Sequence, residues 1–599
     1  MGSSPYSFRT PRDRNRLPTK QPRVFGWANS LKFRAVLVWG VLISAMGCLV
    51  VNLFYVQIVQ GSLLRGIAQS HQVTQIRPFM PRRNIVDRDG NILALDRPVF
   101  TLYAHPKLFK LSKEEVAEKL SPIIERPAAS LVKQFNEGDT GIQVEYSLIE
   151  DISNRVTELR LDGLELIPHQ QRLYPHKEVA ADIVGFVDGE HVGQAGLELS
   201  QQNILTRPSQ EIRLRQMGDG SLMPDQIPAG FLNQDDLQLR LTLDTRLQRA
   251  IQPILQKQVT NVGAKKGTVI VMDAYTGELL TLASYPSYDP NQYYKAKPER
   301  YKTWAITDLY EPGSTFKPIN VAIALENKTV TPDTLIDNPS VISIDDWPIN
   351  GGSGGSDTVT NVVINSYNVG MVHIVDTLKP EVYYAWLRRL GLGGVVGVDL
   401  PSESPGQFKS RKTFLESHID RAVTAFGQGF SLTPMKLVQL HATIANGGKL
   451  VTPHVIQGLF DSKGRLYWRP GLPAQRQVFS PATTKAILPM MEGVVRQGTG
   501  KAAQLPGYHV AGKTGTSQKA NGFGGYSESA YVTSFVAIFP ADKPRYVVLA
   551  VIDEPAGGGY GGTIAAPVVK EVLQVLTALE NIPPSVPGEV GAESEGGTD

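Results

Sequence analysis

The stretch YEPGSTFKP occupies residues 310–318 and decides how the largest part of this chain is expected to fold. Its Pro-Gly pair breaks the preceding structure, and the apolar run at residues 319–325 predicts a largely buried helix that begins at about Ser314. Because residues three apart share a helix face, the Lys317 amine can reach the Ser314 hydroxyl. A serine beside a lysine that its surroundings keep neutral is a nucleophile beside a base.

A serine three residues before a lysine is weak evidence alone, because Ser130 and Lys133 repeat the spacing without a Pro-Gly turn. Two further motifs follow in order: Ser-Tyr-Asn at residues 366–368, the only Ser-x-Asn, and Lys-Thr-Gly-Thr at residues 513–516, with the only Lys-Thr-Gly. Taken singly, the first is more often a loop and the second a strand end. Their presence together, in this order, favours an acyl-transfer site.

Length and composition set the broad class of the protein. A chain of 599 residues exceeds one ordinary domain, and 42% apolar and 20% charged residues are globular values. The net charge of +3 gives no case for nucleic-acid binding. The single cysteine, Cys48, excludes an intrachain disulfide, cysteine catalysis and a cysteine-cluster metal site. No metal ion or cofactor is expected.

The N-terminal segment predicts a membrane anchor. Residues 1–34 are polar and basic, which indicates a disordered cytoplasmic tail, and residues 35–59 carry no charge. As a helix, the uncharged run spans about 37 Å, enough to cross a hydrocarbon core of about 30 Å. It is too long for the apolar part of a typical signal peptide, and a buried core helix is less common at this length. We therefore expect an uncleaved transmembrane helix, with everything after it on the outer face.

The stretch RRNIVDRDGNILA at residues 82–94 predicts a strand, an Asp-Gly turn and a second strand. It resembles the signature that opens the extracytoplasmic part of class B penicillin-binding proteins, with Asn84 where that family usually has glycine. Residues 172–175 and 193–198 resemble the same family's N-terminal pedestal. No catalytic constellation is visible in this region.

The three later motifs resemble those of the penicillin-recognising serine transpeptidases and β-lactamases, whose fold gathers them around one cleft. Taken with the anchor and the pedestal, the resemblance to class B penicillin-binding proteins covers residues 35–579, and it is greatest to their cell-division type. It implies an α+β multidomain fold with a central antiparallel sheet and helices in the catalytic domain. The expected parts are a cytoplasmic tail (1–34), a transmembrane helix (35–59), a dimerisation or pedestal domain (62–233), a transpeptidase domain (234–580) and a disordered tail (581–599).

Local patterns predict the elements around the motifs. They are a strand at 237–243, a helix capped by Asp244, a β-hairpin at 266–284, strands at 532–539 and 546–552, and a closing helix at 564–579. The Lys-Thr-Gly motif is expected on the edge of this sheet. The glycine- and serine-rich residues 351–356 predict no regular structure.

Acyl transfer from a peptide needs a nucleophile, a proton carrier and oxyanion donors. Ser314 is expected to attack, Lys317 to take its proton, and Ser366 to relay a proton to the leaving nitrogen. Asn368 is expected to hydrogen-bond the substrate amide and to orient Lys317. If the family geometry holds, the backbone amides of Ser314 and Thr516 form the oxyanion hole.

The third motif is expected to hold the substrate. Lys513, with the hydroxyls of Thr514 and Thr516, is expected to bind a terminal carboxylate, and Gly515 to let the substrate lie along the strand. Tyr367 stands where the family commonly has serine or aspartate, a departure that concerns the fit of donor or drug.

The resemblance implies a peptidoglycan D,D-transpeptidase that cross-links stem peptides through a serine acyl-enzyme, is acylated by β-lactams, and works at the division septum. Implied partners are stem peptides, lipid-linked nascent glycan, a polytopic glycosyltransferase and other division membrane proteins. The implied location is the bacterial cytoplasmic membrane, with the catalytic domain outside. Three alternatives stay open: an elongation-type class B transpeptidase, a carboxypeptidase or β-lactamase that uses water as acceptor, and a non-catalytic scaffold, which would be expected to have decayed motifs.

Overall fold

The computed structural model describes residues 31–71, 73–76, 80–208, 212–215, 235–520 and 525–586. The chain divides into two units, one made of residues 1–78 and 209–233 and the other of residues 79–208 and 234–599. Residues 1–30 of the predicted basic tail, and residues 587–599 of the predicted C-terminal tail, lie outside the described ranges.

The first unit contains the predicted anchor. Helix α1 (Leu31–Phe54) continues through one π-helical turn, η1 (Tyr55–Val59), and is followed by helix α2 (Gly61–His71). Residues 31–59 have a mean hydropathy of 2.3 over their most apolar window, none of which is buried by protein. A helix of this length and hydropathy is consistent with the predicted membrane helix at 35–59. Strands β1 (Val73–Ile76) and β6 (Ile212–Arg215) pair antiparallel.

The pedestal hairpin of the second unit forms as predicted, from β2 (Asn84–Val86) and β3 (Ile92–Ala104). It belongs to a seven-stranded sheet of order β16-β15-β7-β2-β3-β4, in which β5 also pairs with β3. The other strands are β4 (Ile142–Leu148), β5 (Leu164–Leu173), β7 (Gln238–Leu241), β15 (Ile456–Phe460) and β16 (Leu466–Trp468). Helices α3 (Lys113–Ile124), α4 (Ala128–Phe135) and α5 (Glu150–Glu158) pack on β3, β4 and β5 around a core of their own.

Buried ion pairs explain the charged residues of the pedestal signature. Arg82 and Arg172 each contact the Glu198 carboxylate at 2.7 Å, and Arg172 also contacts Asp96 at 3.1 Å. These side chains are at most 3% exposed. An unpaired buried charge would destabilise the fold, so each of these side chains depends on its oppositely charged partners.

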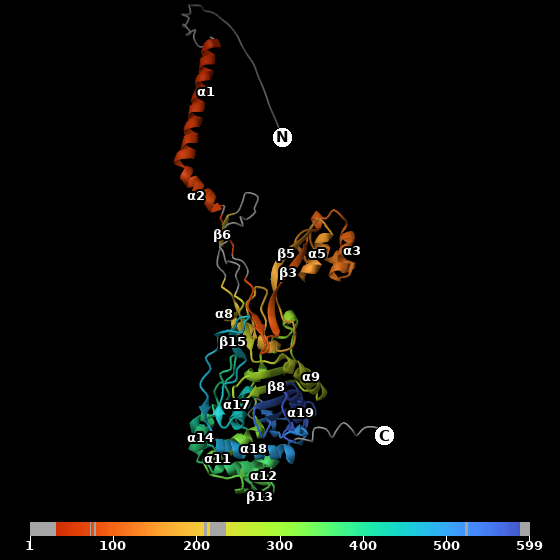
Figure 1. Ribbon diagram of the computed structural model, residues 1–599, viewed down its shortest axis with the longest axis vertical. Helices are drawn as coiled ribbons and strands as arrows, with labels where there is room; N and C mark the ends of the chain where they lie inside the picture. Colours follow the sequence, from red (N-terminus) through yellow and green to blue (C-terminus); the bar gives the residue numbers. More distant parts are fainter. Residues whose placement is uncertain are drawn as a thin grey trace, which may run out of the picture. The chain divides into compact units, whose positions relative to one another are not determined.

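The C-terminal part of the second unit is built on a five-stranded antiparallel sheet of order β18-β19-β20-β8-β9 (Figure 1). Its strands are β8 (Lys266–Asp273), β9 (Leu279–Tyr285), β18 (Ala511–Ala520), β19 (Tyr526–Phe539) and β20 (Tyr546–Asp553). Side chains alternate along β8: Val269 and Val271 join the core under α9 (Thr245–Asn261) and α19 (Gly561–Leu579), whereas Ile270 and Met272 join the main core on the other face. The predicted strands and closing helix are confirmed, with β18 at the edge.

The other face of the sheet carries the remaining helices and three short strand pairs. The helices are α10 (Trp304–Thr307), α11 (Lys317–Glu326), α12 (Val359–Asn365), α13 (Asn368–Asp376), α14 (Pro380–Arg389), α15 (Arg411–Glu416), α16 (His418–Ala425), α17 (Pro434–Ala445) and α18 (Pro481–Arg496). The pairs are β10 (Leu335–Asn338) with β13 (Gly355–Thr358), β11 (Val341–Ile344) with β12 (Trp347–Asn350), and β14 (Lys449–Leu450) with β17 (Arg476–Gln477). Three single-turn helices, α6 (Ala181–Val184), α7 (Gly196–Ser200) and α8 (Gln202–Leu205), lie in the pedestal.

Residues 351–354, which join β12 to β13, have no regular secondary structure, as predicted for 351–356, whereas Gly355 and Ser356 belong to β13. A Cβ on Gly352 would lie 1.7 Å from the Pro339 carbonyl oxygen, so this turn is nevertheless tightly packed. The tail predicted to be free from residue 581 is held over its first residues. Tyr508 donates to the Ile582 carbonyl at 3.0 Å, and Val586 N–H donates to the Gly507 carbonyl at 3.1 Å.

Candidate active site

The serine of the first motif lies in a tightly held turn, Gly313–Phe316, which we call the nucleophile turn. It is a single 3-10 turn that leads directly into α11. The Gly313 N–H donates to the Gly427 carbonyl at 2.9 Å, and a Cβ on Gly427 would lie only 2.0 Å from the Gly313 oxygen. The loop that carries Gly427 therefore fixes the turn and leaves Ser314 half-buried at its surface.

Lys317 is fully buried behind this turn, with 0% of its surface exposed. Its Nζ lies 2.6 Å from the Ser366 carbonyl oxygen, 2.7 Å from Asn368 Oδ1 and 3.2 Å from Ser366 Oγ. Burial lowers the pKa of Lys317 well below its ordinary value, and the charge of Lys513 lowers it further. An amine in this setting can serve as a base near neutral pH.

Ser366 lies between two buried lysines. It ends α12 in the left-handed conformation, with φ +61°, and its Oγ is 3.2 Å from Lys317 Nζ and 2.9 Å from Lys513 Nζ. Lys513 is also 0% exposed, and burial lowers its pKa to about 7. A hydroxyl between two amines, each able to hold or release a proton, can pass protons between them.

Asn368 is oriented by the turn between β12 and β13. Its N–H donates to the Gly351 carbonyl at 2.8 Å, and its Nδ2 donates to the Asn350 carbonyl at 3.2 Å. The side-chain oxygen is thereby directed to Lys317. Sequence reasoning gave these loop residues no part in the site, because a run of glycines and serines carries no signal for the contact it makes.

Asn338 is a second residue that sequence reasoning missed, and its side chain holds the same loop by hydrogen bonds. It is fully buried, accepts the Gly370 N–H at 2.9 Å, and donates to Ser353 Oγ at 3.1 Å and to Asp357 Oδ2 at 2.9 Å. Since Gly370 lies in the first turn of α13, Asn338 joins the loop to the helix that begins at Asn368.

The third motif lies on β18 as predicted. Lys513 Nζ is 3.2 Å from Thr514 Oγ1, which is 2.8 Å from the hydroxyl of Thr499, an exposed residue that sequence reasoning missed. Thr516 Oγ1 accepts the Gly561 N–H at 3.0 Å, and its own hydrogen can still be donated to a ligand. An amine and three hydroxyls therefore line this end of the strand, which suits a carboxylate.

Gly515 also has a packing role, besides the predicted one of letting the substrate lie along the strand. A Cβ at this position would lie 2.5 Å from Ser534 Oγ, 2.8 Å from Thr315 Cγ2 and 3.0 Å from the Pro312 oxygen. The missing side chain therefore makes room for the neighbouring strand and the nucleophile turn, and it lets β18 lie close to that turn.

The second Ser-x-x-Lys match has none of these contacts. Ser130 and Lys133 are exposed on α4, in the pedestal. Burial of the lysine, which lowers its pKa, is what distinguishes Lys317 from Lys133.

Comparison with known proteins gives the family. Residues 267–574, more than half of the chain, match the penicillin binding protein transpeptidase domain, and residues 79–216 match the penicillin-binding protein dimerisation domain. The chain is 41% identical over 590 residues to a peptidoglycan D,D-transpeptidase FtsI homolog of Mesostigma viride, which covers 94% of this chain and 98% of that protein. It is 29% identical to FtsI of Escherichia coli, with 93% of each chain covered.

Solved structures agree with this result. Penicillin binding protein 3 of Mycobacterium tuberculosis, complexed with aztreonam, has a TM-score of 0.65 and 26% sequence identity, with 86% of this chain and 99% of that chain covered. The same protein has also been solved in complex with ampicillin, with the same TM-score and identity. The chain therefore belongs to the class B penicillin-binding proteins, the FtsI-like peptidoglycan D,D-transpeptidases that bind β-lactams.

Proposed function

We propose that this transpeptidase forms its acyl-enzyme on Ser314, with a stem peptide that ends in D-Ala-D-Ala as the donor. The observation that supports the proposal most is the meeting of two fully buried lysines, Lys317 and Lys513, at the Ser366 hydroxyl. Burying a charged amine destabilises a fold, so buried lysines with shifted pKa values are typical of functional sites. Burial lowers the pKa of both Lys317 and Lys513.

In the acylation step, Lys317 takes the proton of Ser314 as Oγ bonds to the donor carbonyl carbon. A neutral amine has two N–H groups and one lone pair. The carbonyl oxygens of Ser366 and Asn368, at 2.6 and 2.7 Å, suit the two N–H groups. The backbone amides of Ser314 and Thr516 stabilise the oxyanion. The proton then passes through the Ser366 hydroxyl to the leaving nitrogen, and D-alanine departs.

In the transfer step, the side-chain amine of a neighbouring stem peptide attacks the acyl carbon. The new C–N bond forms, the C–Oγ bond to Ser314 breaks, and a proton returns to Oγ. The same lysine and serine carry protons in both directions, as the symmetry of the two steps requires.

One test of this function concerns the amine and hydroxyls of Lys513, Thr499, Thr514 and Thr516, which we call the carboxylate clamp. A hydrogen bond to a charged group contributes about 1.5–3 kcal/mol, which corresponds to roughly one to two orders of magnitude in rate. We expect Lys513→Ala to slow acylation by penicillin by that factor, and Lys513→Arg to slow it less because the positive charge is kept. The measurement is the second-order rate constant of acylation.

Lys501→Ala is the matched control, since Lys501 is exposed in the turn just before β18. Rate constants for wild type and Lys513→Ala that agreed within about twofold, in folded proteins, would mean that the carboxylate is held elsewhere.

We also propose that the apolar helix is a single-pass anchor, with residues 1–34 in the cytoplasm and the chain from residue 62 outside. Basic residues on one flank support this orientation. We expect a reporter fused after residue 240 to be active only if it is of the type that requires export. Activity of a cytoplasm-only reporter at the same junction would reverse the assigned topology.

A septal role is part of the proposal, supported by the similarity to FtsI over 93% of the chain. On this basis the partners would be lipid-linked nascent glycan, a polytopic glycosyltransferase and other division proteins in the membrane. The proposed domain boundaries are 62–233 for the pedestal and 234–580 for the transpeptidase domain, and the matched ranges 79–216 and 267–574 support them.

A further inference from the structure

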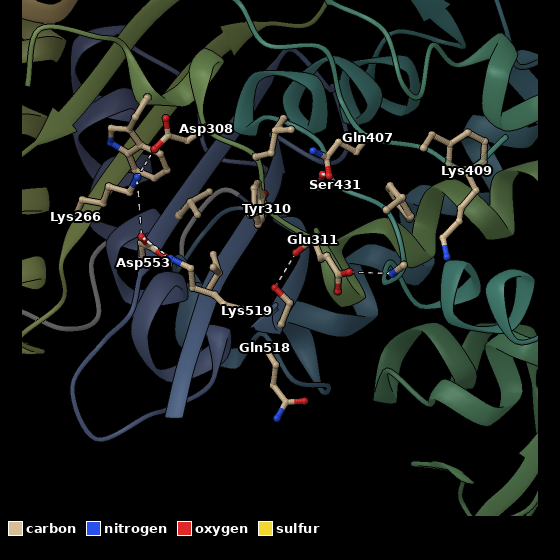
Figure 2. A pocket seen from close by; sticks show the side chains of 18 residues that line it. Lys266, Asp308, Tyr310, Glu311, Gln407, Lys409, Ser431, Gln518, Lys519 and Asp553 are labelled. Carbon is tan, nitrogen blue, oxygen red and sulfur yellow. Dashed lines mark hydrogen bonds and ion pairs between the residues drawn. The ribbon is translucent and has the colours of Figure 1, made fainter. Parts of the chain in front are cut away.

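A pocket of about 670 Å³ lies past the clamp, where β18 continues beyond Thr516 (Figure 2). Its walls include the aromatic rings of Tyr310, Phe408 and Phe430, and Val532 and Val551 line it from the sheet. Figure 2 shows Glu311 in the middle of the pocket, with Lys519 on one side and Lys409 on the other.

This pocket shares a wall with the nucleophile turn. Glu311 stands three residues before Ser314, and the Ser517 hydroxyl donates to the Glu311 carbonyl at 2.7 Å. Ser517 lines the pocket and also lies against the turn, since a Cβ on Gly313 would be 3.4 Å from the Ser517 Cβ. The pocket therefore adjoins the backbone of the nucleophile turn, although Ser314 itself is not among the residues that line it.

The lysines of the pocket already have carboxylate partners. Lys409 pairs with Asp420 at 2.7 Å, and Lys266 pairs with Asp308. Lys519 forms ion pairs of 3.0 Å with Asp553, the last residue of β20, and of 2.7 Å with Glu554, which follows it. No lysine of the pocket depends on Glu311 for its neutralisation.

Glu311, by contrast, has only neutral hydrogen-bond donors. Its half-buried carboxylate accepts the Gly429 N–H at 3.0 Å and the Tyr526 hydroxyl at 3.1 Å. Within the part of the chain that the structure describes, it forms no ion pair. Burial raises the pKa of Glu311 and outweighs the hydrogen bonds and the more distant charge of Lys409, which lower it. A partly desolvated carboxylate gains most from a cation that brings its own hydrogen-bond donors.

An alkylammonium ion is the ligand that this arrangement fits, because it offers three N–H donors to the carboxylate and a positive charge to aromatic faces. We propose that the pocket binds the ammonium-bearing side chain of the acceptor stem peptide, with Glu311 as its carboxylate partner. This inference rests on the proposed function, in which an amine attacks the acyl-enzyme on Ser314.

The proton balance of the transfer step gives Glu311 a second role, as the acceptor of a proton from the bound ammonium ion. An ammonium nitrogen has no lone pair, so it must first lose a proton, which the Glu311 carboxylate accepts and then releases to water. The nitrogen lone pair forms the amide bond to the acyl carbon, the C–Oγ bond breaks, and the second proton leaves the nitrogen for Ser314 Oγ. A raised pKa suits a carboxylate that must accept a proton.

The test compares two nucleophiles on the full-length protein in detergent, acylated by a peptide thioester donor. Cadaverine is an alkylammonium ion at neutral pH, whereas hydroxylamine is largely uncharged. We expect Glu311→Gln, which keeps the size of the side chain and an acceptor for the Gly429 N–H, to lower the ratio of transfer to cadaverine over transfer to hydroxylamine by at least about tenfold. Glu416→Gln, on an exposed residue of α15 outside the pocket, is expected to keep the wild-type ratio.

An unchanged ratio in Glu311→Gln would overturn the inference. Equal losses with both nucleophiles would do so as well, because they would mean a structural effect on the turn. So would a wild-type acyl-enzyme that cadaverine deacylates no faster than water does. If penicillin fails to acylate the wild-type protein on Ser314, the proposed function itself fails, and this outcome is distinct from the others.

Discussion

Replacing Lys317 with methionine is expected to slow acylation by penicillin by about two to four orders of magnitude, the usual contribution of a general base. The side chain is fully buried, and its Nζ contacts Ser366 and Asn368 at 2.6–3.2 Å. Methionine is flexible and apolar and fills much of the same volume, so the variant removes the amine without leaving a large cavity. The measurement is the acylation rate constant, accompanied by the melting temperature.

The pH dependence distinguishes a base from a structural lysine. In the wild type, acylation is expected to rise with pH as Lys317 loses its proton. Because burial lowers the pKa of Lys317, the rise is expected well below the pH at which an ordinary lysine titrates. Lys317→Met is expected to lose this rise.

Lys133→Met is the control, since Lys133 belongs to the exposed second copy of the motif. An acylation rate for Lys317→Met within about threefold of the wild type would contradict the assignment of Lys317 as the base.

Much of the site could be predicted from the sequence because its chemistry is encoded in short spacings. Ser314 and Lys317 are separated by one helical turn, a spacing that places them on one face. Ser366 and Asn368 are one residue apart, and both contact the Lys317 amine. The resemblance carried by the three motifs then implied a central antiparallel sheet, and Lys513 was expected on its edge strand, which the structure confirms.

The remainder depended on contacts between segments far apart in the chain. Nothing near Gly515 indicates that its missing side chain makes room for Thr315, some two hundred residues earlier. Nothing in the sequence distinguishes Asn338 from other asparagines. Its role follows only from the contacts that it makes once β10 and the turn after β12 have folded. Thr499 belongs to no recognisable motif. Its hydroxyl can be assigned to the site only because the Thr514 hydroxyl lies 2.8 Å from it.

The close packing of residues 351–354 could not be predicted for a related reason. Glycine and serine content predicted no regular structure at 351–356, because composition measures the freedom of an isolated chain. In the protein, the glycines instead permit close approach: Gly352 lies where a Cβ would overlap the Pro339 carbonyl. The turn that results orients Asn368, so a glycine-rich segment without regular secondary structure supports the active site.

The second large effect is expected at the nucleophile itself. Ser314→Ala is expected to abolish the covalent adduct with penicillin, since alanine has no oxygen with which to form the acyl bond. Ser314 is half-buried, so removing one hydroxyl is expected to leave the fold intact. Ser130→Ala is expected to keep the adduct, because Ser130 is exposed in the pedestal beside an exposed lysine.

Intact-mass measurement of the full-length protein with and without penicillin tests the central claim most directly. We expect one penicillin added to the wild type and to Ser130→Ala, and none to Ser314→Ala, with the modified peptide of the wild type containing residues 310–318. An adduct that persists in folded Ser314→Ala, or a modified peptide from another part of the chain, would contradict the assignment of Ser314 as the acylated nucleophile.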